Sequence, residues 1–209
     1  LSCILHEQQT LLFAATMADD IRKLVDTRFH DPLRVSLIQE RTSPESIEHN
    51  FQYVNPRNKL SELTRHLAGD DMQQVIIFCN ARHKVDELYR SLKKDITDIE
   101  YIHAGLSQDK RSSIYRRYRK NNIRCLIATD VAGRGLDFSN VSHVVNWDFP
   151  GDGEQYTHRT GRSGRMGRKG KAITFVTRRD IPQLRRLIHK LKIRPQWIGR
   201  DILQEDGLP

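Results

Sequence analysis

The chain has 209 residues, of which 37% are hydrophobic and 29% charged, and its formal net charge is +9. A chain of this length can bury one core of roughly 150 residues with flanking segments. No stretch approaches the ~18 apolar residues of a membrane span, and the first residues lack the charged-then-apolar pattern of a signal peptide. The composition therefore argues against a membrane or secreted protein, and the charge indicates an anionic partner.

The three cysteines, Cys3, Cys79 and Cys125, lie far apart in the sequence, and two of them sit in apolar strand-like runs. This spacing favours neither a zinc site nor a disulfide framework. We expect reduced core thiols in an intracellular protein, cytoplasmic, or nuclear if the source is eukaryotic.

Strand-like apolar runs alternate with amphipathic helical stretches, which predicts an α/β fold with an open, mainly parallel sheet. The pattern predicts a strand over 10–14, a helix over 19–29 and a strand over 33–37. Residues 39–46 are polar, contain a proline and show no periodicity, which is typical of a linker. Further strands are predicted over 47–54, 75–78, 99–102, 124–128, 143–146 and 172–176, and further helices over 59–67, 85–94, 108–120, 155–163 and 181–191.

Polar residues follow several predicted strands at the point where each strand ends. In an open parallel sheet the carboxyl ends share one edge, where ligands collect, so these side chains are expected to converge. Short polar turns also end strands without binding anything, so the pattern favours a site without establishing one. The residues are Asn80, Arg82, His103, Thr129, Asp130, Asn146 and Asp148.

The excess of positive charge lies in residues 159–194, which hold thirteen Lys or Arg and one acid, Asp180, while the rest of the chain is slightly acidic. Charge gathered in this way is more typical of a nucleic-acid or phosphate surface than of a general solubility device. The part from Arg178 to Arg194, taken alone, is also compatible with an ordinary solvated helix face.

Within this basic stretch, Arg162 and Arg165 stand three residues apart, each preceded by a glycine. On a helical turn, residues three apart share a face, so the two guanidinium groups can point into one cleft. Such a pair suits a phosphate. An isolated pair of this kind is more often part of a solvated basic helix.

Longer motifs carry a family resemblance. ATDVAGRGLD at 128–137 and HRTGRSGR at 158–165 closely resemble motifs V and VI of the DEAD-box RNA helicases, which are ATP-dependent remodelers of RNA duplexes and RNA–protein complexes. VIIFCNAR at 75–82 looks like motif IV, HAGLSQDKR at 103–111 looks like motif IVa, and LLFAATM at 11–17 resembles motif III. The resemblance covers the chain almost end to end.

The resemblance implies a RecA-like (P-loop NTPase-type) fold with helices on both faces of the sheet, and a division into domains. Residues 1–38 would be the end of the first of two RecA-like domains, 39–46 the interdomain linker, and 47–209 the second, the helicase C-terminal domain. The sequence contains neither a GxxxxGK[ST] phosphate loop nor an Asp-Glu-Ala-Asp box. We therefore expect the other catalytic half, and the carboxylates that hold Mg²⁺ with ATP, to lie in the first domain, and this chain to be inactive alone.

For ATP, the resemblance implies that Arg162 and Arg165 are arginine fingers that reach the γ-phosphate held by the first domain. Gly135 and Asp137 would contact the ribose side of the nucleotide, since a carboxylate accepts hydrogen bonds from sugar hydroxyls. His158 belongs to the same nucleotide-binding motif and, together with Arg159, would organise it; for His158 a satisfied structural histidine is an equal alternative.

For RNA, the resemblance points to six residues that would grip sugar and phosphate without reading bases, so binding should tolerate changes of sequence and weaken with salt. Asp130 could act by positioning its neighbours. Taken singly, Thr129 could be a strand-end cap and Arg111 a helix-surface charge. The six are Asn80, Arg82, Gln108, Arg111, Thr129 and Asp130.

The chain departs from the family pattern in three places. Ala14 replaces the serine usual in motif III, Ala81 stands where threonine is common, and Ala104 is inserted into the usual His-Gly. Loss of the serine hydroxyl makes the coupling between domains less certain, and the spelling at Ala104 also occurs in RecQ-type DNA helicases. RecQ-like and DEAH-type helicases begin motif VI with Gln, so His158 favours the DEAD-box assignment.

Two functions of different classes follow. The first is the C-terminal half of an ATP-dependent RNA helicase, which binds the RNA sugar–phosphate backbone and works with the first RecA-like domain of the same protein. The second is an RNA- or protein-binding module with a vestigial nucleotide site. The intact Arg162, Arg165 and Asp137 favour the enzyme. We expect the isolated domain to be monomeric, with no membrane partner.

Overall fold

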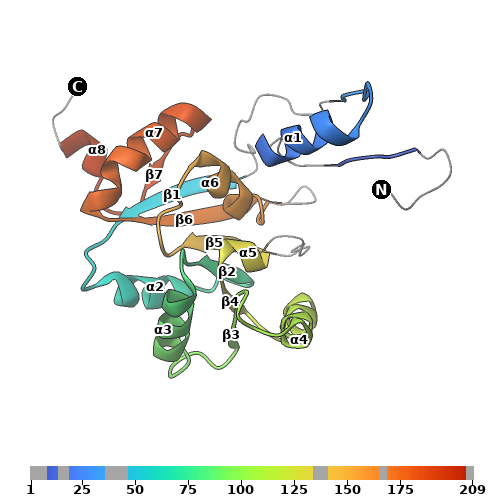
Figure 1. The fold of residues 1–209 in the computed structure, drawn as a ribbon. Helices are drawn as coiled ribbons and strands as arrows, with labels where there is room; N and C mark the ends of the chain where they lie inside the picture. Colours follow the sequence, from blue (N-terminus) through green and yellow to red (C-terminus); the bar gives the residue numbers. More distant parts are fainter. Residues whose placement is uncertain (1–8, 14–18, 36–46, 134–140, 165–168, 206–209) are drawn as a thin grey trace. The chain divides into compact units, whose positions relative to one another are not determined.

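The computed structural model describes residues 9–13, 19–35, 47–133, 141–164 and 169–205 (Figure 1). The chain divides into two compact units, Leu1–Gln39 and Glu40–Pro209. The second unit holds the sheet and most of the helices.

The first unit contains one helix, α1 (Asp19–Arg28), among its described residues. The strands predicted over 10–14 and 33–37 are wrong for their described parts, 10–13 and 33–35, which form no strand. A strand is stable only when its backbone groups pair with a neighbour, and the described part of this unit offers none. The apolar side chains that suggested strands are exposed instead: Leu11, Leu12, Phe13, Leu33 and Val35.

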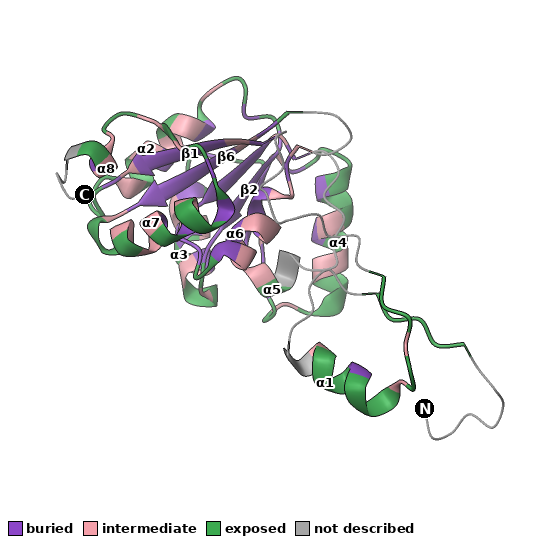
Figure 2. Ribbon diagram, turned by 90° about the horizontal axis from the view of Figure 1, so that it is seen from above, coloured by how far each residue is buried: buried purple, intermediate pink, exposed green. Residues whose placement is uncertain are grey.

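The second unit is built on one parallel sheet, which confirms the predicted fold class. Among the described residues seven strands pair in the order β3-β4-β2-β5-β6-β1-β7, and every pair is parallel. Helices cover both faces, so the strands at its centre are buried and their sequences read as unbroken apolar runs (Figure 2). The strands are β1 (Ile47–Tyr53), β2 (Val75–Phe78), β3 (Ile99–Ile102), β4 (Cys125–Ala128), β5 (His143–Asn146), β6 (Gly170–Val176) and β7 (Gln196–Trp197).

The helices of the second unit are short and amphipathic. They are α2 (Lys59–Leu67), α3 (Arg82–Leu92), α4 (Gln108–Arg119), α5 (Asp130–Gly133), α6 (Gly153–Thr160), α7 (Ile181–Leu191) and α8 (Ile202–Glu205), with a 3-10 turn, η1, at Arg178–Asp180.

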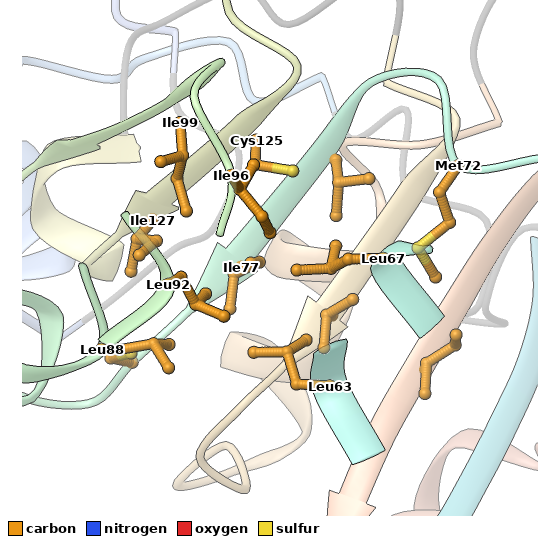
Figure 3. Packing of buried hydrophobic residues seen from close by; sticks show 14 of the residues in the cluster. Leu63, Leu67, Met72, Ile77, Leu88, Leu92, Ile96, Ile99, Cys125 and Ile127 are labelled. Atoms are coloured by element: carbon orange, nitrogen blue, oxygen red, sulfur yellow. The ribbon is translucent and has the colours of Figure 1, made fainter. Parts of the chain in front are cut away.

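Alternation along each strand directs side chains to opposite faces. Val75 and Ile77 of β2 pack with α2 and α3, through residues such as Leu63 and Leu88 (Figure 3). Ile76 of β2 packs on the other face with α4. A third cluster joins α6 and α7 to β1 and β6; its fully apolar members are Phe51, Phe149, Val176, Leu184, Leu187, Leu191, Ile193 and Ile202.

Two helix boundaries differ from the prediction in ways that matter for the site. Helix α3 begins at Arg82, three residues earlier than the predicted start at 85 and closer to the end of β2. Helix α6 runs over Gly153–Thr160 rather than 155–163. Its start is fixed by Asp152, whose side chain accepts from Gln155 N at 2.7 Å. Gly161 caps its end.

Candidate functional site

The carboxyl ends of three neighbouring strands bring polar residues together. In the parallel register, Phe78 of β2 lies opposite Ala128 of β4 on one side and Asn146 of β5 on the other, so these strands end level with one another. Asn80 and Asp130 follow β2 and β4 by two residues. The predicted convergence of strand-end residues at one edge is thus present for the ends of β2, β4 and β5.

The side chain of Arg159, from α6, lies at the centre of this edge and is 1% exposed. Its Nε and Nη2 donate to the two carboxylate oxygens of Asp130, both at 2.7 Å. Nη2 also donates to Asn80 Oδ1 at 2.6 Å, and Nη1 donates to Asp148 O at 2.9 Å and to Asn146 Oδ1 at 3.3 Å. These five residues, Arg159, Asp130, Asn80, Asn146 and Asp148, are called the Arg159 cluster below.

The Arg159 cluster contains a buried ion pair between Arg159 and Asp130, and all three guanidinium nitrogens of Arg159 donate hydrogen bonds within the cluster. A guanidinium fork matched to one carboxylate is the strong form of such a pair. Burial by itself would raise the pKa of Asp130, but the hydrogen bond and the charge of Arg159 outweigh it and hold that pKa below its ordinary value. Removing one partner would leave a buried charge without compensation, which is costly. The cluster therefore fixes α6 against the ends of β2, β4 and β5.

Asn80 is held on its other side by the loop that follows β5. Its Nδ2 donates to Phe149 O at 3.0 Å, and its backbone N donates to Asp148 Oδ2, also at 3.0 Å. Lys84 of α3 donates to Asp148 Oδ1 at 2.9 Å. Lys59, at the start of α2, lies 3.7 Å from the same oxygen, and burial lowers its pKa. The amide of Asn80 is engaged at both of its atoms within the protein.

Sequence reasoning gave Arg159 only an organising role and did not single out Lys59 or Lys84. Their partners are distant in sequence, since Lys84 and Asp148 are 64 residues apart, and Arg159 and Asn80 are 79 apart. A lysine in the first turn of a helix carries no pattern that would mark it as a partner of a particular carboxylate.

The other RNA candidates lie on neighbouring parts of the same unit. Arg82 is exposed at the start of α3, and its Nη1 lies near the turn at Gly105. Arg111 Nη1 donates to Gln108 Oε1 at 3.1 Å in the first turn of α4. Thr129, directly after β4, is only 8% exposed. Arg82 and Gln108 are thus exposed and Arg111 is half-buried, whereas Thr129 lies beneath the surface.

The histidine of the predicted motif IVa closes a tight turn. His103 Nδ1 accepts from Gly105 N at 3.1 Å, and its Nε2 lies 3.2 Å from Asp86 Oδ1 of α3. A Cβ on Gly105 would meet the His103 ring at 3.0 Å, so a side chain there would displace the ring. The turn accommodates the additional Ala104, which is exposed.

Arg162 lies past the end of α6, so the expectation that it sits on a helical turn with Arg165 is wrong for Arg162. Its Nε donates to His158 O at 3.3 Å, and the residue is half-buried. Ser163 bridges to Val141, two residues before β5 begins. Helix α6 therefore runs back along the sheet, and the chain after it passes the amino ends of the strands. Arg159 and Arg162 are three residues apart in the sequence. The side chain of Arg159 reaches the carboxyl ends of the strands, whereas Arg162 lies beside Ser163, toward their amino ends.

Glycines shape the segment that carries Arg162. Gly164 has a φ of 71°, a left-handed conformation that side chains disfavour. A Cβ on Gly170, at the start of β6, would approach Gly164 N to 2.3 Å. The two glycines allow the segment after α6 to lie directly on the sheet.

The remaining nucleotide candidates are less defined. His158 Nε2 lies 4.0 Å from Glu154 Oε1, one turn earlier on α6, a helix-surface pair. Arg165, Gly135 and Asp137 lie outside the described residues. In the part of the chain that the structure describes, no group of three or more His, Cys, Asp or Glu side chains could hold a metal ion, and no helix there could cross a membrane.

The parallel sheet, its strand order and the position of α6 define a RecA-like helicase C-terminal domain. The family model "Helicase conserved C-terminal domain" matches residues 58–167. Among curated relatives, the DEAD-box ATP-dependent RNA helicase CshA of Geobacillus kaustophilus is 42% identical over 98% of this chain and 44% of its own length. The CshA of Bacillus subtilis is 39% identical over 98% of this chain and 42% of its own. The chain belongs to the DEAD-box RNA helicase family, and it spans less than half the length of these relatives.

Solved structures agree. The S. cerevisiae protein Dbp5 bound to RNA and ADP BeF3 superposes with a TM-score of 0.80 at 28% identity, covering 93% of this chain and 52% of that one. The E. coli DEAD-box protein SrmB, bound to the regulator of ribonuclease activity RraA, gives a TM-score of 0.65 at 32% identity, over 76% of this chain and 92% of that one.

Proposed function

We propose that this chain is the second RecA-like domain of an ATP-dependent RNA helicase and that it completes an ATP site and an RNA site begun by a first domain. The proposed division is 1–38 for the end of the first domain, 39–46 for the linker and 47–209 for the second. The observation that carries the proposal is the buried Arg159, which ties the strand ends that bear RNA candidates to the helix that precedes Arg162.

The proposed role of Arg162 and Arg165 is electrostatic. A guanidinium group aimed at the γ-phosphate stabilises the charge that develops on the transferred phosphoryl group, an effect worth ~10³–10⁵ in rate in other phosphoryl-transfer enzymes. The position of Arg162 supports this role, because its Nε donates to His158 O while the residue remains half-exposed. Asp137 and Gly135 would contact the ribose, and the Mg²⁺ that accompanies ATP would be held by the first domain.

The proposed RNA surface is the strand-end edge with the first turns of α3 and α4. Arg82, Gln108 and Arg111 are placed to contact phosphate and sugar directly. Asn80 and Asp130 would act through the Arg159 cluster, by fixing backbone and neighbours, because their side chains are bonded within the protein. Backbone-directed binding of this kind tolerates any sequence.

The proposed cycle is closure of a cleft between the two domains. ATP and RNA would each bind best to the closed state, so each ligand favours the state that the other needs. Helix α6 gives this coupling a physical route, since one end is bonded to the strand-end edge and the other leads into Arg162. Hydrolysis and loss of phosphate would then reopen the cleft. The related Dbp5 structure, bound to RNA and ADP BeF3, supports the pairing of these two ligands. We propose a cytoplasmic location for the protein.

The test is a substitution of both arginines in the full-length protein. With Arg162→Ala and Arg165→Ala, RNA-stimulated ATP turnover should fall by about 10³ or more, while RNA affinity in the presence of a non-hydrolysable ATP analogue stays close to that of the wild type. Arg116→Ala, an exposed cation on α4, is the matched control and should leave turnover unchanged. Turnover that survives the double substitution would refute the arginine-finger role. A wild-type protein that binds RNA but shows no RNA-stimulated turnover would favour a binding module with a vestigial nucleotide site.

A further inference from the structure

The strongest charged patch outside the site lies on and around α7. Six basic side chains there are all exposed. They come from η1, from α7 and from the chain that follows it. The six, called the α7 basic face below, are Arg178, Arg179, Arg186, Lys190, Lys192 and Arg194.

The direction of this face is fixed by the opposite side of α7. Leu184, Leu187 and Leu191 recur at helical spacing and are buried in the third core cluster. Arg186 and Lys190, four residues apart, therefore share the outward side of the helix. The α7 basic face is part of the folded surface and not a loose tail.

No acid within this segment neutralises it. Between Ile181 and Arg200 the sequence contains no Asp or Glu. The preceding acid, Asp180, is engaged by Thr177, whose N and Oγ1 donate to its Oδ2 at 2.8 and 2.6 Å. Across the described residues, none of the six cations forms an ion pair, whereas basic residues elsewhere in the second unit do: Arg65, Lys84, Arg117, Arg124 and Lys171.

The α7 basic face adjoins the edge that carries the Arg159 cluster. Arg178 and Arg179 follow the carboxyl end of β6, on the same edge as the ends of β2, β4 and β5. Gln183 Nε2 donates to Pro150 O at 3.1 Å, and Leu191 is the side chain nearest Gly153. Helix α7 therefore lies along the loop that joins β5 to α6, which is the loop that supplies Asp148 to the cluster.

Lys192 belongs to the α7 basic face and has an unusual backbone conformation. It ends α7 in a left-handed conformation, with a φ of 51°. Glycine is the residue that adopts this conformation without strain. A lysine at that position costs stability relative to glycine, and its exposed side chain adds a cation to the α7 basic face.

We propose that the α7 basic face binds the phosphates of an RNA strand beyond the nucleotides held at the strand-end edge. The inference rests on the proposed function in one respect, that the polyanion at the neighbouring edge is RNA. Helix α7, with 11 residues, is roughly 16 Å long and can follow only a few phosphates. Contacts of this kind lengthen the bound segment and carry no preference for sequence.

The experiment compares two triple variants of the 209-residue chain that lose the same charge at different places. The test variant is Arg186→Gln, Lys190→Gln and Arg194→Gln. The control is Arg116→Gln, Arg119→Gln and Lys120→Gln, three exposed cations at the far end of α4.

Binding of a labelled single-stranded RNA of about 20 nucleotides is measured by fluorescence anisotropy over a range of salt concentrations; this length exceeds the ~4–16 nucleotides that one single-strand-binding domain usually covers. The test variant should lose about tenfold or more in affinity at low salt. The slope of log affinity against log salt should become shallower by about 2, since each single-strand phosphate contact contributes about 0.7. The control should lose much less.

Three results would overturn the proposal. Equal losses in both variants would mean that only net charge matters. Unchanged binding by the test variant would show that the α7 basic face does not bind RNA. Failure of the wild-type chain to bind this RNA at all would also overturn the inference. The proposed function would survive all three results, because in it RNA binds best when two domains close together, and it fails separately if the Arg162→Ala, Arg165→Ala protein keeps its ATP turnover.

Discussion

The Arg159 cluster and the α7 basic face use the same residue types in opposite surroundings. Arg159 is 1% exposed and donates to four different residues, whereas Arg186 is exposed and forms no ion pair among the described residues. A buried cation whose partners are all internal determines the shape of the domain. Exposed cations without partners leave the fold unaffected and can bind a ligand. The difference in burial and pairing distinguishes the cations that stabilise the site from those that can bind RNA.

The largest expected effect is the loss of Arg159. Arg159→Met leaves the Asp130 carboxylate buried without its cation, so the free energy of unfolding should fall by about 3–5 kcal/mol. Urea unfolding followed by circular dichroism measures it. The double variant Arg159→Met, Asp130→Leu should lose less than the sum of the two single variants, because no charge remains unpaired. Strict additivity would show that the two side chains do not act as a pair.

A smaller effect is expected from Asp130→Asn, which keeps the shape of the side chain and removes its charge. The amide oxygen still accepts one hydrogen bond from Arg159, and hydrogen bonds to charged groups contribute about 1.5–3 kcal/mol, so we expect a loss within that range at pH 7, below that of Arg159→Met. The pKa of Asp130 is lower in the folded chain than in the unfolded one. Its contribution to the free energy of unfolding is therefore full above the unfolded pKa of about 3.9.

That contribution is lost as the pH falls through the folded pKa of Asp130. Wild type and Asp130→Asn should therefore converge in stability on acidification, as measured by urea unfolding at a series of pH values. A difference that stays constant down to the lowest pH would contradict the assignment of the ion pair.

A substitution at the end of α7 should raise stability by about 1 kcal/mol. Lys192→Gly relieves the left-handed conformation of a residue that carries a Cβ, although glycine also gains entropy in the unfolded chain. The same variant should bind RNA more weakly, since it removes one cation from the α7 basic face. Thermal unfolding and RNA binding are measured on one sample. Weaker RNA binding with lower stability would show a structural role for Lys192 instead.

The smallest expected effect is on the stability of the α7 test variant. Arg186→Gln, Lys190→Gln and Arg194→Gln together should change the free energy of unfolding by no more than about 0.5 kcal/mol, because exposed cations contribute little to the fold. Measurement by urea unfolding completes the comparison with Arg159→Met. A loss of several kcal/mol would mean that the side chains of this face stabilise the fold, as those of the Arg159 cluster do.

Much of the fold could be predicted because the central strands are buried on both faces. Runs such as Val75–Phe78 and Cys125–Ala128 are continuously apolar, and their strands have the predicted positions to within a residue. The same kind of pattern predicted strands over 10–14 and 33–37 wrongly, because a strand also requires a neighbour to pair with, which local sequence does not show. The short β7 and α8 carry too little periodicity to be recognised.

The residues of the candidate site could be predicted, but the hydrogen bonds between them could not. The strand-end rule placed Asn80, Asp130 and Asp148 at one edge, since topology alone brings them there. The rule could not show that Asn80 and Asp130 bond to Arg159, because that depends on where α6 lies across the sheet. The end of α6 could have been read from Gly161, a typical residue past the end of a helix, instead of extending the helix to Ser163.

The proposed division of labour between two domains is tested most directly by ATP turnover. Hydrolysis is measured for the isolated 209-residue chain with saturating RNA and Mg²⁺, beside the full-length protein under the same conditions. We expect no turnover above buffer from the chain alone, because its sequence contains no phosphate loop, and RNA-dependent turnover from the full-length protein. ATP hydrolysis by the purified chain alone would contradict the claim that it supplies only one wall of the nucleotide site.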